Sequence, residues 1–510
     1  MKTEIIYWSL ILLLGLGACA EDTGNYDYKC INGITIKQLP TDYNDPKIIY
    51  VGDVVQFIPE FIFEKEQDTI GLSYLWIMDK DTVANTRNLN KVILLSPRNR
   101  VFGSYRVYDS KTDVEYITPF YLSIKASLEN GWIFLCKKAN GCGQLNFFRA
   151  EDKENDIKEW LLIDGYLDAN GEDLGKEPIS IRHHFLPMHS MYMFDNQISV
   201  ICQGGPDLSI EVDGNTFKKV ICNKDEFVSN IPPTNFIPQA TFNADAGYSI
   251  MSGGKLYARA RLYDDPFQEG FFTNFPIRPK EPLKSDYELA PIMLPFNFNE
   301  PFAALLFDKK NRSYMVTNGL EIMPLLYDDD TIKAFDPMNV GKQLLTVGRI
   351  KRAEHDFMTG GEFFAILQDQ NGKYWEQIFS AVPPDFGGGF QSIREEPFGG
   401  AAYFSPQSLM ATPTLTSYIY FTSGDGEKLY SYNFVTKETK EIRLTFSGHI
   451  TAMAVEEGDE ELIVGVNNNG VGDIYWLSIK LGKEGTINRK IIGKMGIPID
   501  MKYKPDSWFW

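Results

Sequence analysis

Cysteine, histidine and positive charge are all scarce in this sequence. Of 510 residues only six are Cys and five are His, and 50 Lys and Arg stand against 68 Asp and Glu, which gives a net charge of −18. No Lys/Arg-rich run occurs, and this argues against a nucleic-acid partner, because phosphates need a cationic face. The same shortage disfavours adhesion to anionic lipid headgroups.

Motifs for catalysis and for metal binding are also missing. The sequence has no G-x-S-x-G elbow, Walker loop or dinucleotide fingerprint, and its Cys spacings match no zinc signature. We therefore expect no cofactor and no metal, and we assign no catalytic residue. Paired carboxylates for glycoside hydrolysis remain open, because such residues are paired in space and not in sequence.

The chain begins with an apolar run that ends in a cysteine. Met1-Lys2 precede Ile5–Leu16, and the small residues Gly17 and Ala18 lead directly to Cys19. The run is short for a membrane span and has the layout of a secretory signal. Leu-Gly-Ala-Cys resembles the bacterial lipobox, in which the Cys becomes the acylated first residue. The alternative is an ordinary signal peptide with a chance Cys.

Two acidic residues follow this cysteine. Glu21 and Asp22, directly after Ala20, resemble the export signal of surface lipoproteins in Bacteroidota. The alternative is that these acids only open a polar tether. We expect the protein to be anchored in outer-membrane lipid through acylated Cys19 and to face the cell exterior.

Five cysteines remain after Cys19, so at least one thiol is unpaired within the chain. They are Cys30, Cys136, Cys142, Cys202 and Cys222. Cys136 and Cys142 flank KKANG, which reads as a hairpin turn, so a cross-strand disulfide is geometrically possible. Buried free thiols are an equal alternative.

Residues 31–127 read as short β-strands. In the segment LSYLWIMDKD, Tyr74 and Trp76 share one face by the period of two. The order Gly52-Asp53, Tyr74-Leu75-Trp76 and Gly103–Val107 resembles PKD and immunoglobulin-like sandwiches, whose core is anchored by a buried Trp. We therefore expect Trp76 to be buried.

From Gly131 onward the sequence repeats a strand, a Gly/Asn/Asp turn and a second strand. Seven such units recur at intervals of roughly 45 to 65 residues, a range that includes propeller blades. This predicts a β-propeller of about seven blades, with Ile497–Tyr503 as a strand that completes the first blade. Unrelated hairpins in a sandwich or barrel are the alternative. The whole chain is predicted to be all-β, as a signal peptide (1–18), a lipidated tether (19–30), a PKD-like/Ig-like β-sandwich (31–127) and a β-propeller-like domain (128–510).

Four features together carry a family resemblance. A lipobox, GNYDY soon after it, a PKD-like region and then NGWIFLCKK at the start of the second part resemble the PKD-like family lipoproteins of Bacteroidota. Members of that family tend to be encoded beside SusC-like transporters and SusD-like lipoproteins, which import glycans or peptides. The resemblance therefore implies a surface accessory of nutrient uptake, with a possible importer complex as partner, and it supplies no catalytic residues.

Aromatic residues in two Gly-containing loops are the candidate ligand contacts. They are Phe267, Phe271 and Phe272 in DDPFQEGFFTNF, and Phe386 and Phe390 in PPDFGGGF. Such rings can stack on sugar faces or hold peptide side chains, and the alternative is that they pack the loops onto the propeller. The expected function is a non-catalytic surface lipoprotein that binds a glycan or peptide nutrient or docks on a SusC/SusD-like importer. A propeller hydrolase acting on extracellular glycan or peptide is the alternative.

Overall fold

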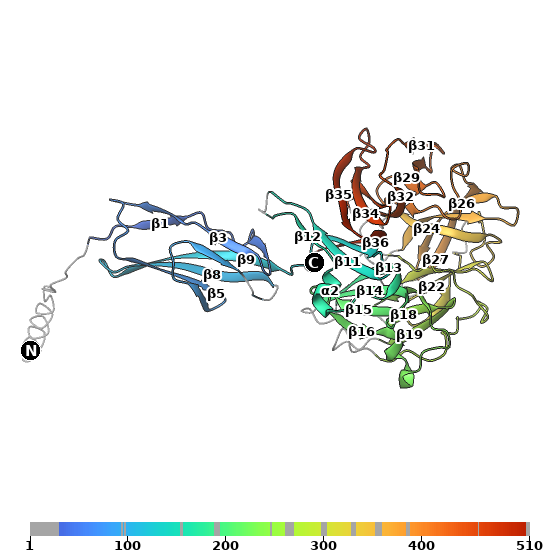
Figure 1. Ribbon diagram of the computed structural model, residues 1–510, viewed down its shortest axis with the longest axis horizontal. Coiled ribbons are helices and arrows are strands. Elements are labelled where there is room, and N and C mark those ends of the chain that lie inside the picture. The colour runs from blue at the N-terminus through green and yellow to red at the C-terminus, as the bar shows by residue number, and fades with distance from the viewer. Residues whose placement is uncertain are drawn as a thin grey trace, which may run out of the picture. The chain divides into compact units, whose positions relative to one another are not determined.

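The computed structural model is built almost entirely of β-strands, which confirms the predicted fold class (Figure 1). The chain divides into two compact units, Met1–Lys125 and Ala126–Trp510. Among the described residues, no helix is long and apolar enough to cross a membrane. The structure describes residues 30–92, 95, 98–153, 157–187, 194–244, 247–260, 270–296, 303–327, 333–351, 360–383, 388–456 and 458–505.

The first unit is a β-sandwich. One layer is a five-stranded sheet in the order β2-β9-β8-β5-β6, and two two-stranded sheets, β1-β4 and β3-β7, supply the other strands. Side chains from all three sheets meet in one core. The strands are β1 (Ile34–Lys37), β2 (Lys47–Tyr50), β3 (Val54–Phe57), β4 (Glu60–Phe63), β5 (Leu72–Met78), β6 (Asp81–Ala84), β7 (Leu89–Val92), β8 (Arg98–Asp109) and β9 (Val114–Lys125).

Trp76 on β5 is the centre of the sandwich core, as the sequence predicts. Its side chain is fully buried. The indole ring lies 4.1 Å from the Tyr105 ring and 5.9 Å from the Phe57 ring, centroid to centroid. Its Nε1 donates a hydrogen bond of 2.8 Å to the carbonyl oxygen of Thr86. The large ring is therefore packed on its faces and satisfied at its one polar atom.

We predict that Trp76→Ala lowers the free energy of unfolding of the sandwich by about 3–5 kcal/mol, because the lost ring leaves a cavity in the core. The measurement is urea unfolding of the full chain, followed by protease cleavage within residues 30–125. Ile70→Ala is the control, since Ile70 is 76% exposed and its loss should change stability by less than about 0.5 kcal/mol. A loss below about 1 kcal/mol for Trp76→Ala would contradict the assignment.

The described part of the second unit forms seven antiparallel sheets, which are the blades of the propeller. In blades 2 and 4 to 7 the four strands follow chain order, and blade 3 has three strands. Blade 1 comprises β36 (Ile497–Lys504), β10 (Gly131–Lys137), β11 (Gly143–Arg149) and β12 (Trp160–Leu162). Blade 2 comprises β13 (Lys176–Pro187), β14 (Phe194–Gly204), β15 (Ser209–Asp213) and β16 (Lys219–Cys222). Blade 3 comprises β17 (Pro238–Asn243), β18 (Gly247–Ser252) and β19 (Lys255–Ala260).

The remaining four blades are regular, and short helical turns lie outside the sheets. Blade 4 comprises β20 (Leu294–Pro295), β21 (Ala304–Asp308), β22 (Ser313–Thr317) and β23 (Ile322–Pro324), and blade 5 comprises β24 (Gln343–Lys351), β25 (Gly361–Gln368), β26 (Tyr374–Val382) and β27 (Gly389–Pro397). Blade 6 comprises β28 (Met410–Ala411), β29 (Tyr418–Thr422), β30 (Leu429–Asn433) and β31 (Thr439–Ile442). Blade 7 comprises β32 (His449–Val455), β33 (Glu461–Asn468), β34 (Val471–Ser478) and β35 (Ile487–Met495). The helical turns are α2 (Gly165–Asn170), η1 (Asn223–Glu226) and η2 (Val228–Asn230).

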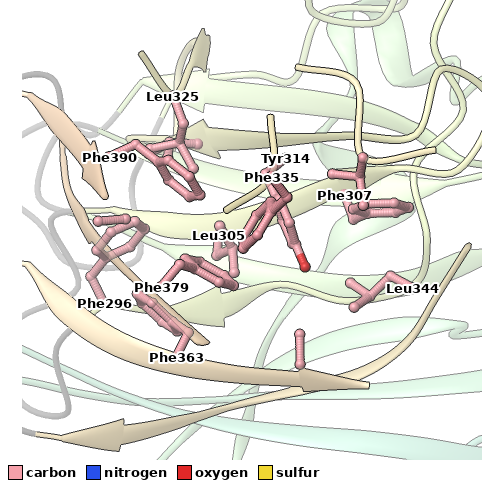
Figure 2. Close-up of a cluster of buried hydrophobic side chains, with 14 of the residues drawn as sticks. Phe296, Leu305, Phe307, Tyr314, Leu325, Phe335, Leu344, Phe363, Phe379 and Phe390 are labelled. Carbon is pink, nitrogen blue, oxygen red and sulfur yellow. The ribbon is translucent and has the colours of Figure 1, made fainter. Parts of the chain in front are cut away.

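Each blade shares a hydrophobic core with both of its neighbours. Seven clusters of buried side chains join blades 1 and 2, 2 and 3, and so on around the ring to blades 7 and 1. Figure 2 shows the cluster between blades 4 and 5, where the ring of Tyr314 from blade 4 lies 4.8 Å from that of Phe379 from blade 5, centroid to centroid. Because both faces of the sheets are covered there, inner strands such as β21 and β33 read as nearly continuous apolar runs.

The C-terminal strand closes the ring, as the sequence predicts. β36 pairs antiparallel with β10, with Trp132 opposite Tyr503 and Phe134 opposite Met501. It also contacts both neighbouring blades: the Ile181 amide donates to the Asp500 carboxylate at 3.0 Å, and the Thr451 hydroxyl donates to the Pro498 carbonyl at 2.7 Å. Blade 1 therefore combines the first and last strands of the propeller.

The cysteines form no disulfide among the described residues. Cys30, Cys136, Cys142, Cys202 and Cys222 are all free thiols. Cys136 stands opposite Gln144 in the β10–β11 register, so it does not face Cys142. Both thiols are buried. Of the two alternatives for this pair, the free buried thiols are observed.

Candidate functional site

The outer rim of blade 3 differs from the rims of its neighbours, because an irregular segment replaces the fourth strand. Residues 270–277 follow the free edge of β19. The amides of Gly270, Thr273 and Ile277 donate to the carbonyls of Ala260, Ala258 and Leu256 at 3.0, 3.4 and 2.7 Å. The edge of the sheet is therefore covered by chain that does not keep a strand register.

A second segment, between η1 and η2, holds residues 270–277 from the other side. Phe227 and Phe272 form a parallel bridge. The Phe272 amide donates to the Glu226 carbonyl at 2.7 Å, and the Val228 amide donates to the Phe272 carbonyl at 3.0 Å. Phe227 and Phe272 are fully buried, whereas their chain neighbours Val228 and Phe271 are exposed.

The inward side of this pairing is a fully buried aromatic and ionic base. Phe272 stacks on Phe227 with ring centroids 5.0 Å apart, and neither side chain is exposed. The Arg259 guanidinium lies 5.0 Å from the Phe272 centroid and 4.8 Å from that of Tyr248. Its Nη2 is 2.7 Å from Oε1 of Glu211, and both of these side chains are completely buried. A buried ion pair is tolerated only when it is held in good geometry, so this base is a fixed support.

The outward side is a group of exposed apolar side chains, which we name the blade-3 rim patch. It consists of Val228, Ile231, Phe271 and Phe275, which are 45%, 60%, 59% and 70% exposed. The Thr273 hydroxyl donates to the Phe275 carbonyl at 2.8 Å, and the Asn274 amide group donates to the Val228 carbonyl at 3.1 Å. These bonds fix the backbone of both segments. Apolar groups gathered on a built surface in this way are typical of interaction sites.

The structure separates the aromatic residues that the sequence grouped together. Phe271 is exposed in the rim patch, whereas Phe272 is fully buried beneath it. Phe390 is also buried, with its ring 5.3 Å from that of Phe379 and 5.6 Å from that of Phe335 (Figure 2). Phe272 and Phe390 are therefore core residues, and the packing alternative accounts for both. Cys19, Glu21, Asp22, Phe267 and Phe386 lie outside the described residues.

Sequence reasoning found Phe271 of the rim patch and Phe272 of its base, and it missed the other residues of both. Phe275 ends the loop that was singled out, but Val228 and Ile231 belong to a distant segment whose pairing with residues 270–277 has no local signal. Glu211 and Arg259 lie inside strands whose other charged residues, Asp213 and Lys255, stand at a strand end. A charge flanked by apolar residues inside a strand is the sequence signal for a buried ion pair.

Comparison with solved structures finds other proteins that are similar over long stretches at low identity. A quinonprotein alcohol dehydrogenase-like protein from Bacteroides thetaiotaomicron is 14% identical, with 91% of this chain and 97% of that chain covered and a TM-score of 0.39. Hydrazine synthase of Kuenenia stuttgartiensis is 11% identical, with 62% of this chain and 88% of that chain covered and a TM-score of 0.34. The Cps50 (Swd1) beta-propeller domain of Myceliophteria thermophila is 9% identical, covering 62% and 87%, with a TM-score of 0.34. These values carry no information on what this chain binds.

A search of curated proteins found no match. Among family models, that of the PKD-like family matches residues 19–178. The match includes the whole sandwich together with blade-1 strands β10 to β12 and the beginning of β13. The N-terminal part of the chain is thus similar to the PKD-like family.

Proposed function

We propose that the protein is a non-catalytic lipoprotein of the outer-membrane surface whose propeller docks on a SusC/SusD-like importer and takes part in capturing a glycan or peptide nutrient. The observation that supports docking most strongly is the blade-3 rim patch. Two Phe side chains more than half exposed rest on a base that is fully buried. Aromatic anchors on a rigid support are the usual energetic centre of protein interfaces.

The exposure of the patch favours a protein partner over a small molecule. A small ligand needs a concave site that encloses most of its surface. Side chains that are 45–70% exposed stand out from the surface and are not the walls of such a site. A partner with a broad complementary surface can cover them, and the apolar area removed from water then stabilises the complex by about 25 cal/mol per Å².

The location in this proposal rests on the start of the sequence. Gly17, Ala18 and Cys19 follow the apolar run, and Glu21 and Asp22 follow the Cys. Acyl chains on Cys19 would hold the protein in the outer membrane, and the acids would direct it to the outer leaflet. An importer in the same membrane is then within reach of the tethered propeller.

The docking surface is tested with the double variant Phe271→Ser/Phe275→Ser. Loss of two aromatic anchors costs about 1–2 kcal/mol each, so recovery of the importer complex from detergent-solubilised outer membranes should fall at least tenfold. The melting temperature should stay unchanged, because both rings are exposed. Val435→Ser on blade 6 is the matched control, since Val435 is 63% exposed and lies outside the patch. Equal recovery with the double variant, or an equal loss with the control, contradicts docking through this patch.

The anchor is tested with Cys19→Ala. This variant should take up no labelled fatty acid and should be released from the membrane, because it lacks the acylated thiol. Cys30→Ala is the control, since it removes the next cysteine and should leave labelling intact. Glu21→Ala/Asp22→Ala should keep the lipid and lose accessibility to external protease in intact cells. Labelled fatty acid on Cys19→Ala would refute the lipobox assignment, and undiminished digestion of the acid variant would refute the export signal.

A further inference from the structure

A cleft of about 460 Å³ lies between blades 6 and 7, away from the rim patch. One side is the face of blade 6 formed by β29, β30 and β31. The other side is the loop between β34 and β35, residues 479–486. The volume is within the range of small-ligand sites.

The blade 6 side of the cleft is a row of polar side chains. Tyr420, Ser431 and Lys440 stand next to one another across three strands, as the register places Tyr420 opposite Ser431 and Ser431 opposite Lys440. Tyr418 and Thr416 extend the row toward the start of β29. These side chains share one face of the sheet, because neighbours on one strand are two residues apart and neighbours on adjacent strands are paired directly.

The hydroxyl groups in this row are not engaged by any described residue. Within the described part of the chain, the hydroxyls of Tyr418, Tyr420 and Ser431 make no hydrogen bond, and Oγ1 of Thr416 is buried without one. Burial, with the nearby Glu484 carboxylate, raises the pKa of Tyr420, so this hydroxyl keeps its proton at neutral pH. The cleft therefore presents several groups that can both donate and accept.

The charged side chains of the cleft balance one another. Lys440 pairs with Glu438 at 3.4 Å, and Glu441 pairs with Lys428 at 3.5 Å. Arg443 and Glu484 also line the cleft, and neither makes an ion pair with a described residue. One open guanidinium and one open carboxylate give no net preference for an anion or a cation, and both are strong partners for neutral hydroxyls.

The opposite wall presents apolar side chains beside Glu484, and its backbone is closely held. Ile479 and Leu481 line it, and Leu481 at the mouth is 87% exposed. Gly485 anchors the loop at φ +80°, where a Cβ would come within 2.8 Å of Cγ2 of Ile442. Glycine fits both this backbone conformation and this contact, so the loop packs closely on blade 6 at Gly485 and the spacing of the two walls is fixed there.

We propose that this cleft binds a sugar unit of a neutral glycan. A pyranose ring has apolar C–H faces and a rim of hydroxyls that donate and accept, which matches one apolar wall, one wall of open hydroxyls and balanced charges. The exposed mouth at Leu481 lets a longer chain continue into solvent. This inference rests on the nutrient-binding part of the proposed function and names its ligand class, and it does not involve the rim patch.

The test is titration of the purified, detergent-solubilised full-length protein with neutral oligosaccharides by isothermal calorimetry. The probes are cellohexaose, maltohexaose, xylohexaose and mannohexaose, with hexa-alanine and hexaglycine as peptide probes. At least one oligosaccharide should bind, and Tyr418→Phe and Arg443→Ala should each weaken its binding at least tenfold. Tyr403→Phe is the matched control, because Tyr403 lies in the connection between β27 and β28, is 49% exposed and is outside the cleft. It should change binding less than twofold.

Several results would overturn the assignment. They are binding of no oligosaccharide, binding that both cleft variants leave unchanged, and binding of a peptide probe in place of sugar. Because Arg443 is exposed, Arg443→Ala keeps the test valid even if a tyrosine variant is unstable. Importer recovery with the cleft variants should remain at the wild-type level, so failure of glycan binding is distinguishable from failure of docking.

Discussion

The pairing of β36 with β10 is the constraint on which the rest of the propeller depends. Without it, blade 1 would lose the strand that contacts both neighbours through Ile181 and Thr451, and β10 would become an open edge. A blade is a sheet with two apolar faces, so it is stable only between two other blades. Closure supplies the neighbour that the first and last blades would otherwise lack, and the core around Phe134 and Trp476 forms there.

The sequence allowed the regular part of this architecture to be predicted. Hairpin turns rich in Gly and Asn recur through the propeller region, and the apolar period of two around Trp76 located the sandwich core. The strand at Ile497–Tyr503 is expected in blade 1 because a propeller must close its ring or leave edge strands exposed. Local patterns were sufficient here, since each hairpin is formed by residues close together in sequence.

The candidate site could be predicted only in part, because its geometry comes from irregular, long-range pairing. Phe271 and Phe272 are adjacent and alike in sequence, yet one is exposed and the other is core, as decided by the bridge to Phe227. The same holds for Glu211 and Arg259, which meet only when blades 2 and 3 pack together. The rim patch and the cleft occupy separate blades of one closed ring, so a partner and a glycan need not compete for the same surface.

The most direct test of this account is hydrogen exchange, followed by mass spectrometry, at residues 497–504 of the intact protein. If β36 closes the ring, its amides should exchange as slowly as those of the central strands β14 and β25, because opening β36 exposes the cores of blades 1, 2 and 7. Exchange of residues 497–504 as fast as that of the outermost strand β12, while β14 and β25 stay protected, would contradict closure and with it the rigid ring that presents both surfaces.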